Sequence, residues 1–395
     1  MSQKVTATVG EKLHTAINQI VDRFKDPEPA AFVSFGTIVF DDIEYPGGTL
    51  IESNLGGEGL WATFGARLFK PKEKSKEIGC LIVIGKRYPH AHALFKMLVK
   101  SWNILVVVHV RNNMPINRAR VKYACSGHLL RTIRYETPLL TPTASHLGNT
   151  RSFLAADSFH FACFLHDAEA QILALNRLRE GNGINNHPLI VWQPAHTGGI
   201  ARELIMFEKN MEKYKALLRL TDVFSLSYHE LRDIAGVRNV AHPPAHFFPL
   251  MSFETYLRRT IEFLITPIAK SRIGPTGGGV IIIRCEPFGY YYRKWNRVGW
   301  VRSYKNHYDY QPVTDFTGAG SAFLGAFSVR FIESGDVVDS CLRSAVAASF
   351  AMEQFGLPVM TTCPQQKGDE VHDGELWNHD SAFDRLRVLY RRRER

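Results

Sequence analysis

Short apolar runs alternate with longer amphipathic stretches along most of this chain. Residues 78–84 are apolar throughout, and residues 104–110 and 280–285 nearly so, which is typical of strands in a sheet covered on both faces. Stretches of helical period separate these runs, and the connections between them are short. The pattern therefore predicts a mainly parallel sheet with helices on both faces.

The same reasoning assigns the remaining elements. Further strands are expected at residues 189–192 and 223–226, and as a hairpin at residues 290–294 and 298–304. Helices are expected at residues 60–69, 90–100, 159–180, 204–220, 228–234, 253–269, 320–333 and 337–355.

The two ends of the chain differ from its middle. Residues 1–30 carry apolar side chains at helical spacing among charged ones, which predicts an amphipathic helical extension. Residues 31–360 form the predicted domain, and a Pro46-Gly47-Gly48 turn between short strands predicts a small β-lid within it. Residues 361–395 form a basic tail, whose arginines could bind nucleic acid or an anionic membrane. A solvated end is the simpler interpretation, and we favour it.

Composition limits the class of protein. The 395 residues are 45% hydrophobic, which is enough for a large core, and no apolar run reaches the roughly 20 residues of a transmembrane helix. The six cysteines form no C-x-x-C pair, which favours reduced, buried thiols over a disulfide framework or a zinc site. We therefore expect a soluble, cytoplasmic protein.

A glycine-rich segment is the strongest candidate for chemistry. Residues 315–326 read Asp-Phe-Thr-Gly-Ala-Gly-Ser-Ala-Phe-Leu-Gly-Ala and precede an apolar helix. Glycines let the backbone approach a ligand closely, and the N–H groups at the start of a helix attract anions. A turn that only packs tightly against the sheet has the same composition. The segment is therefore a candidate phosphate site, with tight packing as the alternative.

This segment resembles the second signature of the PfkB, or ribokinase-like, carbohydrate kinases, whose D-T-x-G-A-G-D pattern forms an anion hole for phosphate. Residues 54–62, Asn-Leu-Gly-Gly-Glu-Gly-Leu-Trp-Ala, are similar to the first signature, G-G-x-x-x-N-x-A, which lines the sugar site. Further similarity at residues 35–43, 65–69, 159–161, 190–194 and 348–350 points to the fungal branch of the family, one member of which maintains the killer double-stranded RNA of yeast.

The resemblance extends from about residue 31 to about residue 358. It implies a ribokinase-like three-layer α/β/α sandwich with a central, mainly parallel sheet and a small β-lid. It also implies ATP and Mg²⁺ as cofactors and a small-molecule alcohol as substrate. Lids of this fold often pair, so a homodimer through the lid is a further expectation.

The resemblance also implies a role for each matching residue. The transferred phosphate would be stabilised by Gly318, Ala319 and Gly320, with Ser321 at the position of the catalytic base. The nucleotide would lie near Thr317, Glu286 and Ser349, and Mg²⁺ near Glu230. The substrate site would be lined by Asp41, Asp42, Gly56, Gly57 and Trp61.

Four positions depart from the family patterns. Ser321 replaces the aspartate that acts as general base, and a serine hydroxyl cannot hold a proton at neutral pH as a carboxylate can. Ser227 replaces the asparagine of the N-x-x-E metal motif, Glu286 replaces a nucleotide-side glycine, and Trp61 replaces the sugar-side asparagine.

Three functions stay open at this point. The first is an ATP-dependent phosphotransferase with a degenerate catalytic loop, acting on a hydroxyl of a sugar, nucleoside or related metabolite. The second is a catalytically impaired pseudokinase that acts through ligands or partners. The third is a specialised fungal biosynthetic enzyme that uses the same cleft.

Overall fold

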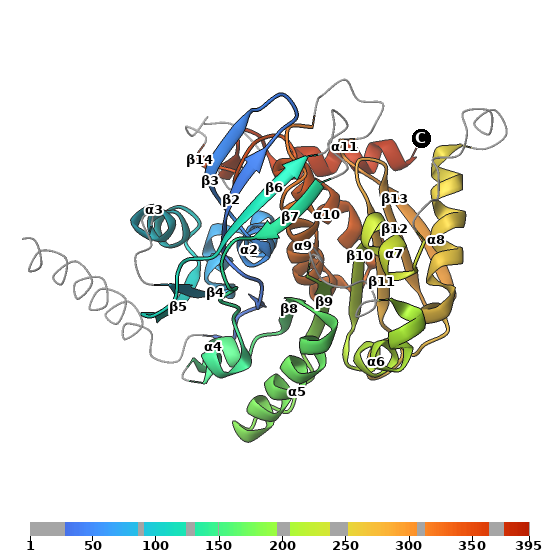
Figure 1. The fold of residues 1–395 in the computed structure, drawn as a ribbon, viewed down its shortest axis with the longest axis horizontal. Coiled ribbons are helices and arrows are strands. Elements are labelled where there is room, and N and C mark those ends of the chain that lie inside the picture. The colour runs from blue at the N-terminus through green and yellow to red at the C-terminus, as the bar shows by residue number, and fades with distance from the viewer. Residues whose placement is uncertain are drawn as a thin grey trace, which may run out of the picture.

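A nine-stranded sheet forms the centre of the molecule (Figure 1). The computed structural model describes residues 28–85, 91–123, 131–148, 150–195, 206–237, 252–305, 313–362 and 375–394. The strand order is β13-β12-β11-β10-β9-β8-β1-β4-β5, and every pairing is parallel except those of β12 and β13 at one edge. The prediction of a mainly parallel sheet is confirmed.

The strands of this sheet are short and, in the centre, fully buried. In order across the sheet they are β13 (Arg297–Arg302), β12 (Gly289–Lys294), β11 (Val280–Cys285), β10 (Val223–Ser227), β9 (Leu189–Pro194), β8 (Ser158–Cys163), β1 (Phe32–Ser34), β4 (Ile78–Gly85) and β5 (Leu105–Arg111).

Helices cover both faces and complete a three-layer sandwich. One face packs against α2 (Glu58–Leu68), α3 (Ala91–Phe95), α9 (Ala319–Ser334), α10 (Val337–Ala351) and α11 (Ala382–Glu394). The other face packs against α4 (Arg151–Leu154), α5 (Leu165–Gly181), α6 (Phe207–Leu220), α7 (Tyr228–Ile234) and α8 (Phe253–Ala269). Short helical turns lie at η1 (Lys72–Glu77), η2 (Lys96–Ser101) and η3 (Ala144–Leu147).

The expected β-lid is a separate four-stranded sheet beside the sandwich (Figure 1). Its order is β3 (Leu50–Gly56), β2 (Val39–Glu44), β6 (Arg118–Tyr123) and β7 (Arg131–Tyr135). The β2–β3 hairpin follows from the predicted turn, whereas β6 and β7 come from a part of the chain to which no element was assigned. A third, two-stranded sheet pairs β14 (Met360–Thr362) with β15 (Glu375–Trp377).

The predicted helix over residues 159–180 is wrong at its start. Ser158–Cys163 is strand β8, buried along its whole length and paired with β1 and β9. Only Phe164 separates this strand from α5, so an apolar strand and an apolar helix start read as one continuous run. Burial on both faces removes the alternation that would distinguish them.

The C-terminal residues are folded, although the sequence favoured a solvated end. Helix α11 packs Leu386 and Leu389 into the same apolar cluster as α2, α9 and α10. Its other face is basic, so the helix is amphipathic and its arginines do not prevent docking. The expected N-terminal helix lies within residues 1–27, outside the described residues.

Two expectations from composition concern the described residues. Cys80, Cys163, Cys285 and Cys341 are buried free thiols, as expected. Within the same residues, every helix is too short or too polar to span a bilayer.

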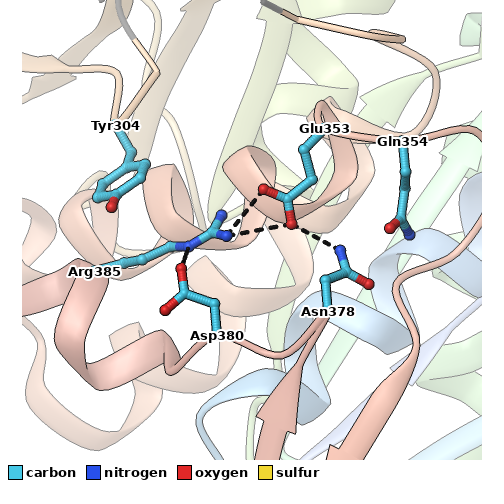
Figure 2. Close-up of a pocket in the computed structure, with 6 residues that line it drawn as sticks. All are labelled: Tyr304, Glu353, Gln354, Asn378, Asp380 and Arg385. Atoms are coloured by element: carbon cyan, nitrogen blue, oxygen red, sulfur yellow. Dashed lines mark hydrogen bonds and ion pairs between the residues drawn. The ribbon is translucent and has the colours of Figure 1, made fainter. Parts of the chain in front are cut away.

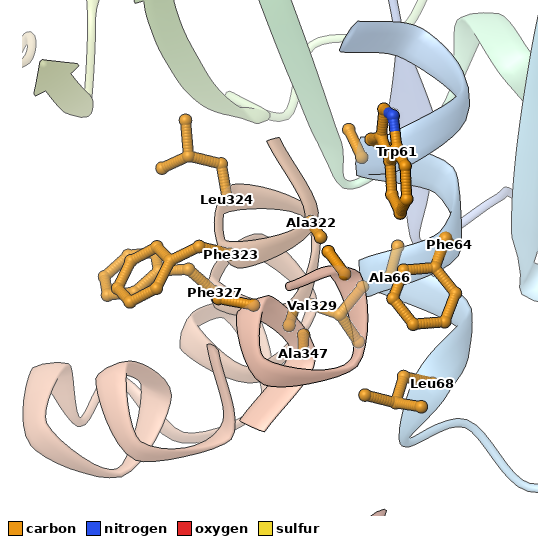
Figure 3. Close-up of a cluster of buried hydrophobic side chains, with 14 of the residues drawn as sticks. Trp61, Phe64, Ala66, Leu68, Ala322, Phe323, Leu324, Phe327, Val329 and Ala347 are labelled. Carbon is orange, nitrogen blue, oxygen red and sulfur yellow. The ribbon is translucent and has the colours of Figure 1, made fainter. Parts of the chain in front are cut away.

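Helices α2 and α9 pack almost backbone to backbone. A Cβ atom added to Gly65 would lie 1.8 Å from the carbonyl oxygen of Ala322, and one added to Gly325 would lie 1.8 Å from that of Ala62. Both helices carry side chains of one apolar cluster: Phe64 lies on α2, and Phe327 lies on α9 and points away from α2 (Figure 3). The close approach brings the two predicted signature segments together, because α2 follows one and α9 follows the other.

Candidate functional site

The loop before α9 is held in place by Asp315. Its Oδ1 accepts a hydrogen bond of 3.0 Å from the backbone N–H of Thr317 and a second one from the hydroxyl of Tyr123 on lid strand β6. Asp315 is 1% exposed, so both bonds are shielded from water. The lid and the glycine-rich loop are therefore joined by one buried carboxylate.

The start of α9 presents free backbone donors. Gly318 caps the helix with φ 82°, a left-handed conformation that favours glycine. Within the described part of the chain, the N–H groups of Gly320 and Ser321 have no acceptor, whereas that of Ala319 bonds to Phe316. Unpaired N–H groups and the helix dipole together favour an anion.

Ser321 belongs to a buried hydrogen-bonded chain. Its Oγ donates to Oε1 of Gln193 at 3.2 Å, and the same oxygen lies 3.3 Å from Nε2 of His160. Because an amide oxygen only accepts, His160 carries its proton on Nε2, and its Nδ1 accepts from Ser34 Oγ at 2.9 Å. The hydroxyl of Ser321 therefore ends on an amide, which cannot take up a proton.

Two members of this hydrogen-bonded chain, His160 and Gln193, were not predicted as site residues. His160 was assigned to a helix, and Gln193 was noted only as part of residues 190–194. The two side chains stand on adjacent parallel strands, β8 and β9; Gln193 contacts Ser321, and His160 contacts Gln193. Polar residues at the ends of apolar runs were the signal available in the sequence.

Burial lowers the pKa of His160 from its ordinary value of 6.5 to about 4. Since the unfolded chain takes up a proton below about pH 6.5 and the folded chain does not until pH 4, stability is complete at neutral pH and falls as the pH falls. We expect His160 alone to cost about 2 kcal/mol of unfolding free energy between pH 7 and pH 5.

Urea unfolding at both pH values measures this cost. In the variant His160→Gln, the difference in unfolding free energy between pH 7 and pH 5 should be smaller by about 2 kcal/mol. The matched control is His187→Gln, which removes a half-exposed histidine and should not reduce the difference in this way. An NMR titration of the His160 imidazole with a midpoint near 6.5 would contradict the expectation.

Arg284 on β11 reaches the start of α9. Its guanidinium donates to Ser225 Oγ at 3.1 Å and pairs with Glu230 at 3.4 Å. Its Nη1 lies against Gly320, where an added Cβ atom would be 1.5 Å away. Arg284 was not predicted as a site residue, although it lies at the end of a predicted strand, two residues before Glu286.

The carboxylate of Glu230 is already occupied. It caps α7 by accepting from the backbone N–H of Ser227 at 2.7 Å, and it pairs with Arg284. A magnesium ion beside a nucleotide is usually held by one or two carboxylates together with waters and phosphate oxygens. The described residues contain no group of three His, Cys, Asp or Glu side chains that would hold a metal. Because its oxygens already accept hydrogen bonds from Arg284 and from the Ser227 N–H, we expect Glu230 to be a poor magnesium ligand.

On the substrate side, Trp61 fills the space between the two signature segments. Its ring lies 2.1 Å from a Cβ added to Gly318, and its Nε1 lies 3.2 Å from one added to Gly56. Trp61 is 2% exposed, and its Nε1 has no partner within the described residues. An indole thus occupies the place where the resemblance expects an asparagine that binds hydroxyl groups.

The remaining substrate-side residues lie on lid strand β2 and at the start of α2. Gly57 caps α2 with φ 94° and leaves no room for a side chain, since an added Cβ atom would lie 2.4 Å from the carbonyl oxygen of Thr37. The carboxylate of Asp41 lies beside Gly56. Asp42 instead pairs with Arg118 at 2.7 Å within the lid. Burial opposes ionisation of Asp42, but the Ser53 N–H and Arg118 outweigh it and lower its pKa.

The two other nucleotide-side residues lie apart. Glu286 directly follows β11 and is half-buried. Ser349 is buried, and its Oγ accepts a hydrogen bond of 2.9 Å from Arg385 on α11. The C-terminal helix therefore covers Ser349.

A polar hollow of about 440 Å³ opens beside this contact (Figure 2). It is lined by Tyr304, Glu353, Gln354, Asn378, Asp380 and Arg385. Figure 2 shows the carboxylates of Glu353 and Asp380 both directed at the guanidinium of Arg385. The charges of this hollow are thus paired with one another.

Comparison with known proteins agrees with this architecture. No known protein-family profile matches the sequence. An uncharacterized protein of Schizosaccharomyces pombe is 25% identical over 372 residues, which span 91% of this chain and 92% of the relative.

Solved structures give a broader comparison. A ribokinase of Giardia lamblia matches with a TM-score of 0.58 and 15% identity over 84% of this chain and 94% of its own. An Anopheles gambiae adenosine kinase matches with a TM-score of 0.58 and 13% identity over 82% and 96%. A putative ribokinase II of E. coli, in complex with ATP and Mg²⁺, matches with a TM-score of 0.55 and 14% identity over 92% and 99%. The chain therefore has the ribokinase-like fold, and its structural neighbours are sugar and nucleoside kinases.

Proposed function

We propose that this protein is a catalytically impaired ribokinase-like protein that binds a phosphate-bearing ligand at the start of α9. The observation that carries the proposal is Ser321. Its hydroxyl stands where a general base is needed, and it donates to Gln193, an amide without basic character. The site thus keeps a phosphate-binding backbone but lacks a group to accept the substrate's proton.

The unpaired N–H groups of Gly320 and Ser321 support ligand binding. A nucleotide is the first candidate, since neighbours of the same fold include a fructokinase with bound ATP. The buried indole of Trp61 argues against an ordinary sugar, because it removes both space and hydrogen-bonding groups on the substrate side. The relation to fungal PfkB proteins stays a prediction.

The variant Ser321→Asp tests the missing base. With ATP, Mg²⁺ and a panel of nucleosides and other small alcohols in place of ordinary sugars, we expect phosphorylation by the wild type to be no faster than the background rate. A carboxylate at this position should raise turnover by about 10²–10⁴-fold over the wild-type background, which is the usual contribution of general base catalysis. The matched control is Ser321→Asn, which has the same size and no basic group.

A slow phosphotransferase is the second candidate, and the free donors at the start of α9 favour it. In that case the wild type itself would phosphorylate one member of the panel, and Ser321→Asp would bring no increase over Ser321→Asn. That result would overturn the proposal of an impaired site.

A further inference from the structure

Two positive groups lie at the start of α9. One is the helix N-terminus, and the other is the guanidinium of Arg284, which is 5% exposed. Within the described residues, Arg284 uses Nε for Ser225 and Nη2 for Glu230, and its Nη1 has no partner. Nη1 is not among the fully buried unpaired atoms of the described residues, so a ligand can reach it.

The nearby carboxylate does not remove this positive charge. Glu230 lies 3.4 Å from Nη2, at the long end of an ion pair, and it also accepts from the Ser227 N–H. The Nη1 side of the guanidinium faces Gly320, away from that pair. Arg284 Nη1 therefore lies beside the helix start at which the N–H groups of Gly320 and Ser321 have no acceptor among the described residues.

We infer that Arg284 takes the place of a divalent cation, so that a phosphate group binds at the start of α9 without metal. A guanidinium offers paired N–H donors that match phosphate oxygens, and it carries a permanent positive charge. In this arrangement Glu230 orients Arg284 and does not hold magnesium. The inference rests on the proposed function, since it describes how the same site would bind its ligand.

Calorimetric titration with ATP in EDTA and in excess Mg²⁺ tests the inference. For the wild type we expect dissociation constants within about threefold of each other in the two buffers. The double variant Arg284→Met/Glu230→Gln removes the cation without leaving Glu230 unpaired. It should weaken ATP binding in EDTA by about 10–100-fold, the usual effect of losing a hydrogen bond to a charged group.

The control is Arg219→Met, which removes one exposed arginine from the end of α6 on the opposite face of the sheet. It should change the affinity by less than twofold. Thermal unfolding of each variant confirms that it is folded, and Arg284→Lys retains the charge if the double variant does not fold. Binding by the wild type only in Mg²⁺ would overturn the inference and leave the proposed function standing. Absence of ATP binding in both buffers would overturn both.

Discussion

Gly325→Val is expected to destabilise the fold by about 3 kcal/mol or more, a strong case of overpacking. Gly325 lies where α9 crosses α2, and even a single added carbon would lie 1.8 Å from the carbonyl oxygen of Ala62. Atoms that are not bonded cannot approach so closely, so the two helices must separate. Separation would expose part of the apolar cluster that includes Phe64 and Ala322 (Figure 3).

Urea unfolding followed by circular dichroism measures the effect. The matched control is Gly181→Val at the end of α5, where no heavy atom lies within 4 Å of an added Cβ. Surface changes of this kind are usually within about 0.5 kcal/mol of the wild type. If Gly325→Val unfolded at the same urea concentration as Gly181→Val, that result would contradict the close packing of α2 against α9.

The central sheet could be predicted because its strands are apolar and its helices amphipathic. Residues 280–285, for example, coincide with β11. The lid was only half predicted, although β6 alternates buried Ala119 and Val121 with exposed or half-exposed basic residues. That period of two was present in the sequence and was overlooked among the many charged side chains.

The site shows a different limit of prediction. The glycine motifs of the sequence located the loop before α9 and the cap of α2, because the need for glycine at a helix start depends on the local backbone conformation. Arg284 reaches Gly320 from β11 and Gln193 reaches Ser321 from β9, and only the order of the strands in the sheet brings these side chains to one loop. No local pattern reports which side chains meet across a sheet edge, so the basic group beside the phosphate loop could not be predicted.

The C-terminal helix shows how a local charge count can mislead. Six arginines in residues 384–395 favoured a solvated end. Arg385, however, is 7% exposed at its side chain and pairs with Glu353 at 2.9 Å and with Asp380 at 2.6 Å. Its guanidinium also stacks on Phe350, 3.6 Å from the ring centre. One buried arginine among exposed ones fixes the helix, and net charge does not distinguish them.

Arg385→Met is therefore expected to release α11 from α10. Removing one partner of a buried ion pair leaves an uncompensated charge, here on Glu353, and typically costs about 3–5 kcal/mol. Lys305, 3.5 Å from Glu353, is too distant to replace both hydrogen bonds of the guanidinium. The lower stability should appear as a lower urea midpoint, and the release of α11 as faster proteolytic cleavage within residues 375–394.

The matched control for this change is Arg391→Met, on the same helix but exposed to solvent. It removes the same charge and should leave both readouts within error of the wild type, because exposed arginines contribute little. Equal proteolysis of the two variants would mean that α11 is held by Leu386 and Leu389 alone.

Since Arg385 also donates to Ser349, its release should uncover that hydroxyl, which the sequence placed beside the nucleotide. A gain in ATP affinity in Arg385→Met but not in Arg391→Met would then identify α11 as a cover over the nucleotide side of the cleft.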